Sequence, residues 1–177
     1  EADFELVTIL RDCARTSHIP VHLTHQENID YGATIPLSFL LQHLPKTKII
    51  PVHYSSLDYE THFHFGRVLQ QEILNHSKRI AVIASGDLSH RLSEDGPAGF
   101  SPQAKVFDAK VVEALSSLDH KTLMGMDQSL AQDAHECGLR SFLILLGIFN
   151  SVNARFEQLS YEHPFGIGYL LGKITPQ

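Results

Sequence analysis

The segment Arg79-Ile-Ala-Val-Ile-Ala-Ser-Gly-Asp-Leu-Ser-His90 decides how the rest of the sequence is interpreted. Its apolar residues 80–84 are typical of a strand that is buried on both faces of a sheet. The apolar run breaks at Ser85-Gly86, and a carboxylate and an imidazole follow at Asp87 and His90. Ligands of open α/β sheets bind just beyond the carboxyl ends of the strands, so we expect the candidate site in this turn.

Strands and helices alternate outward from this segment. Apolar spacing predicts helices at 3–17, 30–41 (a buried helix), 60–76, 103–117, 120–124, 128–135 and 138–150. Strands are expected at 19–24, 48–54 and 79–85, with a closing pair at 154–161 and 166–174. The order predicts an α/β fold, a three-layer α/β/α sandwich around a mainly parallel mixed sheet.

The composition favours a single globular domain and argues against a nucleic-acid-binding, membrane-spanning or disulfide-rich protein. A chain of 177 residues is expected to form one domain over 1–177, and its net charge of −6 argues against a nucleic-acid-binding surface. The sequence contains no run of about eighteen apolar residues, so no membrane-spanning helix is predicted. Two distant cysteines, Cys13 and Cys137, predict no disulfide framework and a cytoplasmic location. Because the sequence begins at Glu1 without Met, we expect further chain upstream in the natural gene product.

Histidine is the unusual residue of the composition. The twelve histidines are His18, His22, His25, His43, His53, His62, His64, His76, His90, His120, His135 and His163. A metal site needs only two or three of them, and most histidines form ordinary hydrogen bonds. The number of histidines therefore does not identify metal ligands, and the surrounding sequence motifs must do so. His62 and His64 share a helical context, and we assign neither a role.

The turn Gly86-Asp-Leu-Ser-His90 has two interpretations. An imidazole titrates near neutral pH, so His90 could move protons at a strand end, with Asp87 and Ser89 beside it. An ordinary Asp/Ser turn with a packed or solvated histidine explains the motif equally well.

A second cluster surrounds Glu136-Cys-Gly, just before an apolar helix. A carboxylate beside so apolar a segment is costly to bury unless it is paired or bound to a metal. By itself, an ion pair between Glu136 and Arg140 is the better interpretation, and Cys137 reads as a buried structural thiol rather than a nucleophile. A third candidate is Asp30-Tyr31, where a helix N-terminus could hold an anion or Asp30 could simply cap the helix.

Four motifs in order give a more specific signal than any one of them. They are Asp30-Tyr-Gly-Ala, Ile83-Ala-Ser-Gly-Asp-Leu-Ser-His90, Glu136-Cys-Gly-Leu-Arg-Ser and Ser160-Tyr-Glu with the later Pro164-Phe-Gly. The chain resembles the class III extradiol ring-cleavage dioxygenases, the LigB-like superfamily. Within it the sequence is most similar to the dioxygenase-like domain of AmmeMemoRadiSam system protein A, with the Memo proteins more distant.

The resemblance implies roles for particular residues. In that family two histidines and one glutamate hold a mononuclear Fe(II), and a separate histidine is the acid and base for a catecholic substrate. His90 matches the acid/base, and Glu136 matches the glutamate ligand. Tyr31 stands where the family's Asp-His-Gly motif has a further histidine, so Tyr31, Asp30, Asp87 and Ser89 are expected in the substrate pocket.

The resemblance also implies what is missing. The family's two histidine ligands lie on N-terminal strands that would precede Glu1, and no histidine here matches them. We therefore expect an N-terminally truncated domain, or one that has lost the iron site and holds Zn or no metal.

The first hypothesis is an extradiol dioxygenase that acts on a small aromatic substrate and O2. Neither nucleic acid nor a membrane is expected as a partner. A homodimer and a fused or associated AMMECR-type domain are left open. The alternative is a non-catalytic LigB- or Memo-like scaffold that uses the same cleft for a ligand or peptide. A hydrolase using Ser85 or Ser89 with His90 ranks last, because no G-x-S-x-G turn is present.

Overall fold

The computed structural model describes residues 1–24 and 29–177, so His25 lies outside the described residues. Its helices are α1 (Phe4–Thr16), α2 (Tyr31–Leu40), α3 (Tyr59–Asn75), α4 (Pro102–Ser116), α5 (His120–Met124), α6 (Gln128–Ala134) and α7 (Leu139–Ile148). Each coincides with a helix expected from the apolar spacing, so those seven predictions are confirmed. Asp, Ser or Gly occupies the N-cap position of all seven helices, as expected for residues that favour helix starts.

None of the described helices is both long enough and apolar enough to span a bilayer.

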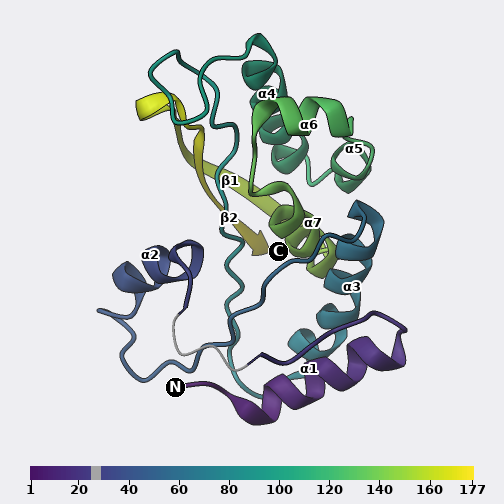
Figure 1. Ribbon diagram of the computed structural model, residues 1–177. Coiled ribbons are helices and arrows are strands. Elements are labelled where there is room, and N and C mark those ends of the chain that lie inside the picture. Colours follow the sequence, from purple (N-terminus) through teal and green to yellow (C-terminus); the bar gives the residue numbers. More distant parts are fainter. Residues whose placement is uncertain (25–28) are drawn as a thin grey trace.

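The two closing strands form an antiparallel hairpin. β1 (Ala154–Glu162) pairs with β2 (Tyr169–Pro176), and the register shifts between Gln158 and Ser160. The short 3-10 turn Pro164–Gly166 joins them. Figure 1 shows this hairpin running diagonally past α7, with α4, α5 and α6 on one side. The sequence-based expectation of two closing strands is therefore confirmed.

The core lies among the helices of the second half of the chain and the hairpin. Its fully buried side chains include Leu88, Phe107, Val111, Leu123, Leu139 and Leu143. Helices α3 and α7 approach so closely that a Cβ on Gly66 would overlap the Ile144 carbonyl, and one on Gly147 would overlap the Phe63 carbonyl. Glycine is required at this crossing because any side chain would push the two helices apart.

The expected parallel sheet is not present in the described part of the chain. Segments 19–24, 48–54 and 79–85 are extended, but the structure assigns no strand to them, and Ile49 forms only an isolated parallel bridge with Ala2. Segment 79–85 is also not buried on both faces, because Val82 and Ile83 are 38% and 48% exposed. A strand needs a ladder of hydrogen bonds to a neighbour, and within residues 1–24 and 29–177 none of the three segments forms more than this single bridge. The prediction of three strands was wrong here, and the fold is a mixed α/β arrangement with a small antiparallel sheet.

Helix α2 corrects a further expectation. The helix forms where predicted, but none of its residues is buried. Tyr31 and Phe39 are 83% and 68% exposed. Figure 1 shows α2 set apart from the other helices, which explains why none of its apolar residues is buried. The expected burial was wrong because composition reports how apolar a helix is, not whether a surface is available to cover it.

Candidate active site

The turn that carries His90 is anchored on two sides. On one side, the Leu88 N–H donates to the Gly168 carbonyl at 2.9 Å, and the Gly168 N–H donates to the Ser89 carbonyl at 2.8 Å. On the other side, the His90 N–H donates to the Ala134 carbonyl at 3.0 Å. Leu88 and Ser89 are completely buried. The backbone of His90 is therefore fixed between the start of β2 and the end of α6.

A buried carboxylate supports the same turn from α4. Asp108 is 1% exposed, and it accepts hydrogen bonds from the Ser89 N–H at 2.9 Å and the Tyr161 hydroxyl at 2.6 Å. Burial raises the pKa of Asp108, and these two hydrogen bonds partly offset the rise. Burial and the neighbouring carboxylate also raise the pKa of Tyr161.

Asp108 was not among the site residues predicted from the sequence. The signal was its position, because Asp108 falls among Ala104, Phe107 and Val111 on the apolar face of α4. A lone carboxylate on such a face must find hydrogen-bond donors inside the protein.

The side chains of Asp87 and His90 meet in this turn. Asp87 Oδ2 lies 3.2 Å from His90 Nε2, and both side chains are partly buried. A carboxylate at this distance fixes the orientation of an imidazole. The pair can therefore accept and return a proton at a fixed position.

Ser89 has a different environment from the one expected. Its hydroxyl donates to the Ala134 carbonyl at 3.0 Å and accepts from the Arg91 N–H at 3.1 Å. Because Ser89 is completely buried, it supports the turn from inside the protein. The same environment leaves no exposed Ser89 nucleophile for the hydrolase hypothesis.

Cys137 joins Asp87 and His90 from a second loop. The Asp87 N–H donates to Cys137 Sγ at 3.2 Å, and one potential ligand atom from each of the three residues lies within 4.8 Å of the others. Burial raises the pKa of the Cys137 thiol. The two loops can touch because Gly86, at φ +154°, packs directly against Gly138. From the sequence, Cys137 is expected to be a buried structural thiol, so this group of three is not predicted.

Glu136 faces a neighbouring pocket rather than this group. Its Oε2 accepts a hydrogen bond from the Leu139 N–H at 2.7 Å, at the first turn of α7. Burial raises the pKa of Glu136, and the bond to Leu139 offsets part of the rise. Arg140 lies within electrostatic reach of Glu136, but the two form no ion pair within 4.0 Å in the described residues.

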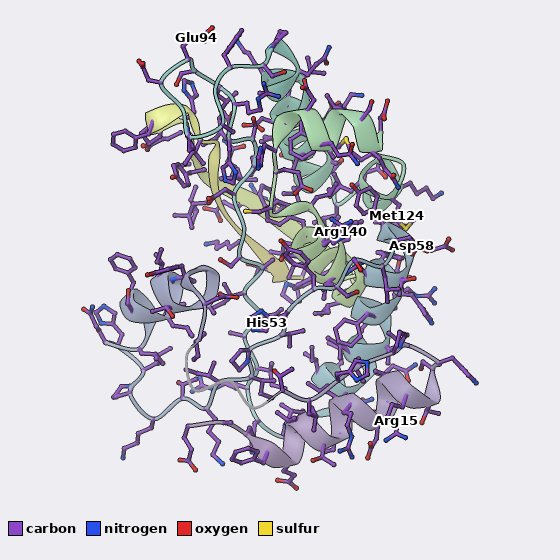
Figure 2. The ribbon with its side chains drawn as sticks, viewed as in Figure 1. Arg15, His53, Asp58, Glu94, Met124 and Arg140 are labelled. Atoms are coloured by element: carbon purple, nitrogen blue, oxygen red, sulfur yellow. The ribbon has the colours of Figure 1, made fainter. Side chains whose placement is uncertain are left out.

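The pocket has a volume of about 480 Å³ and combines charged, amide and aromatic side chains. Its lining residues are Ser56, Leu57, Asp58, Tyr59, Gln128, Ala131, Gln132, His135, Glu136 and Arg140. Arg140 lies over the Tyr59 ring, 5.2 Å from its centroid, and Figure 2 shows Arg140 and Asp58 in the same region of the molecule. The His135 ring lies 6.1 Å from the His90 ring, so the pocket adjoins the His90 turn.

Asp30 and Tyr31 stand at the start of α2. Asp30 caps the helix by accepting a hydrogen bond from the Ala33 N–H at 3.0 Å, and it forms an ion pair with His53 at 3.0 Å. The Tyr31 side chain points into solvent. The first turn of α2 nevertheless touches the end of segment 79–85, because the Ser85 hydroxyl donates to the Gly32 carbonyl at 2.5 Å.

Tyr54 is a further residue that the sequence analysis did not single out. Burial raises the pKa of its hydroxyl, and the nearby Cys137 and Glu136 raise it further. No sequence signal marked it, since it follows Pro51-Val52-His53 in an ordinary extended segment.

The iron-binding set implied by the resemblance does not assemble in the described residues. Glu136 belongs to no group of three metal-ligating side chains there, and the group that does assemble is Asp87, His90 and Cys137. A face of two histidines and one carboxylate is the arrangement typical of non-haem Fe(II) oxygenases. The donors present are instead one nitrogen, one sulfur and one carboxylate oxygen, so they do not fit that set.

Comparison with known proteins gives the family. Residues 1–172 match the family described as the catalytic LigB subunit of aromatic ring-opening dioxygenase. A Clostridium acetobutylicum protein, named Protein CA_C1420, is 34% identical over 146 residues, which cover 82% of this chain. The chain spans about a third of the length of that relative, 31%. Since the family match covers nearly the whole sequence, the chain belongs to the LigB family of aromatic ring-opening dioxygenases.

Proposed function

We propose that this chain carries the acid/base part of an extradiol dioxygenase active site that opens catecholic rings with O2. The observation that carries the proposal is the contact between His90 Nε2 and Asp87 Oδ2 at 3.2 Å, on a turn anchored by buried hydrogen bonds. Membership of an aromatic ring-opening family supports the same reaction class. The natural substrate is a small aromatic compound with a free hydroxyl group.

His90 and Asp87 would handle the substrate proton. His90 accepts a phenolic proton at its ring, and Asp87 stabilises the resulting imidazolium. His90 then returns the proton as the ring-opened product forms. Glu136 is the Fe(II) ligand expected from the resemblance, and Fe(II) held there would supply the activation of O2.

Several finer expectations belong to this proposal. They are the closeness to the dioxygenase-like domain of AmmeMemoRadiSam system protein A, a cytoplasmic location, a single LigB-like domain, a three-layer sandwich around segment 79–85 and association with an AMMECR-type domain. The match over residues 1–172 supports a single domain. The exposed side chains of Val82 and Ile83 are apolar, which supports layers that would cover both sides of segment 79–85.

The decisive experiment combines metal content with ring cleavage. The protein is purified without oxygen, loaded with Fe(II) and tested against a panel of catechols. We expect ring cleavage that is lost in His90→Ala and Glu136→Ala and retained in His43→Ala, which removes an exposed histidine. Absence of turnover in the iron-loaded wild-type protein across the panel contradicts the proposal.

The second candidate is a non-catalytic scaffold that binds a ligand or peptide in the same cleft. The bond between Glu136 and the Leu139 N–H favours it, because a carboxylate engaged in this way stabilises α7 without any metal. Ligand binding that survives Glu136→Ala, in a protein that retains no iron, would establish the scaffold.

A further inference from the structure

Asp87, His90 and Cys137 bring three different donor atoms together from loops that are 50 residues apart in sequence. We infer that these three side chains form a binding site for a thiophilic divalent cation, and that the ion they suit is Zn(II). This assignment goes beyond the proposed function, because it concerns neither Glu136 nor the iron of the ring-opening reaction.

The chemistry of the donors selects the ion. Zinc sites in proteins are built from cysteine sulfur, histidine nitrogen and carboxylate oxygen, and three protein ligands leave a fourth position for water or another ligand. A thiolate favours Zn(II) over the hard ions Mg²⁺ and Ca²⁺, which prefer oxygen. The potential ligand atoms already lie within 4.8 Å of one another, so only small side-chain rotations would be needed to close around an ion.

The backbone of the two loops is built for this approach. A Cβ on Gly86 would overlap the Gly138 backbone, and a Cβ on Gly138 would meet the Asp87 carbonyl at 2.9 Å. Both glycines are therefore needed to bring Cys137 beside Asp87. Hydrogen bonds behind Ser89 fix the opposite side of the group, since Asp108 and Ala134 hold this residue. Such support holds metal ligands in position before the ion arrives.

The sulfur of Cys137 already has the hydrogen bond that a metal thiolate uses. The Asp87 N–H points at Sγ, 3.2 Å away. Backbone N–H groups aimed at sulfur stabilise the negative charge of a ligating thiolate. When the ion binds, a zinc–sulfur bond replaces the S–H bond and the proton passes to solvent, with no change of oxidation state.

Zinc binding and proton transfer by His90 exclude each other. An imidazole nitrogen that donates its lone pair to zinc cannot accept a proton at the same atom. Zinc at this site would therefore inhibit any acid/base reaction of His90.

Co(II) is the probe for the test, because a cobalt–thiolate bond gives a charge-transfer absorption band that nitrogen and oxygen ligands do not give. The chain offers a matched control, since its two cysteines are Cys137 in the group and Cys13 on α1. Wild-type protein and Cys13→Ser are expected to show the band with one Co(II) per chain, and Zn(II) to abolish it by displacement. Cys137→Ser is expected to lack the band and to bind Zn(II) at least about tenfold more weakly.

Asp87→Asn provides a second variant if Cys137→Ser fails to fold. It retains the thiol and should weaken Zn(II) binding while keeping a weaker cobalt–thiolate band. A band that persists in Cys137→Ser, or one that disappears in Cys13→Ser, overturns the assignment. Metal bound without any thiolate band does so as well, because it reveals adventitious binding by other histidines. These measurements use no aromatic substrate, so their failure leaves the ring-cleavage test unaffected.

Discussion

Helices α2 and α7 are each ten residues long and similarly apolar, yet their environments are opposite. Helix α7 packs against α3 and buries Leu139, Leu143 and Leu146, whereas α2 buries none of its residues. The difference lies in the surface offered by the rest of the chain, since α3 presents glycine and apolar side chains to α7. An apolar composition therefore favours burial of a helix, but whether the helix is buried depends on the surfaces that the rest of the fold places against it.

The largest effect is expected from a matched pair of phenylalanines. Phe142→Ala in α7 should lower the free energy of unfolding by about 3–4 kcal/mol, because it removes a buried aromatic side chain from the core. Phe39→Ala in α2 should change it by less than about 0.5 kcal/mol, because that ring is already in solvent. Urea denaturation followed by circular dichroism measures both. Equal losses would show that α2 is packed in solution.

Glycines in the same two helices give the next test. Gly147→Ala should cost about 2–3 kcal/mol, because its methyl group would overlap the Phe63 carbonyl at the crossing of α3 and α7. Gly32→Ala should stay within about 1 kcal/mol of wild type, since alanine favours helix and its nearest neighbour is Asp30 Oδ1 at 3.3 Å. Thermal unfolding compares the two variants. A tolerated Gly147→Ala would contradict the close crossing.

The buried side of the molecule should also respond to pH through Asp108. A carboxyl group whose folded-state pKa is raised contributes stability below its unfolded pKa, near 3.8, and loses that contribution as pH rises through the folded-state value. The stability of the wild type relative to Asp108→Asn should therefore fall as the pH rises from about 4. Urea denaturation of both proteins across this range measures the difference. A difference that is independent of pH would place the Asp108 pKa at its ordinary value.

The smallest effect is expected at the N-cap of α2. Asp30→Ala removes the acceptor for the Ala33 N–H and should cost about 1 kcal/mol of local helix stability. Because α2 buries no residue, the loss should appear as faster amide hydrogen exchange in residues 31–40 with little change in global unfolding. Asp119→Ala, at the N-cap of α5, is the control, since Leu123 of that helix is part of the core. If global stability falls by the same amount in both variants, α2 is coupled to the core.

The candidate site was partly predictable because part of it is local in sequence. The turn from Gly86 to His90 places Asp87 three residues before His90, and their contact follows from that short spacing. Cys137 and Asp108 could not be found in the same way. Each reaches the turn through tertiary structure, Cys137 across the contact of Gly86 with Gly138 and Asp108 across the packing of α4.

The seven helices, the closing hairpin and the family could be predicted from the sequence, because helix periodicity, capping residues and ordered motifs are local properties of the chain. The tertiary structure was needed to show that segment 79–85 pairs with no strand within residues 1–24 and 29–177 and that α2 lies exposed. It also separated Glu136 from the group formed by Asp87, His90 and Cys137. The physical reason is that strand pairing, burial and metal-ligand geometry each require a partner that is distant in sequence, and no local pattern specifies which partner will be present.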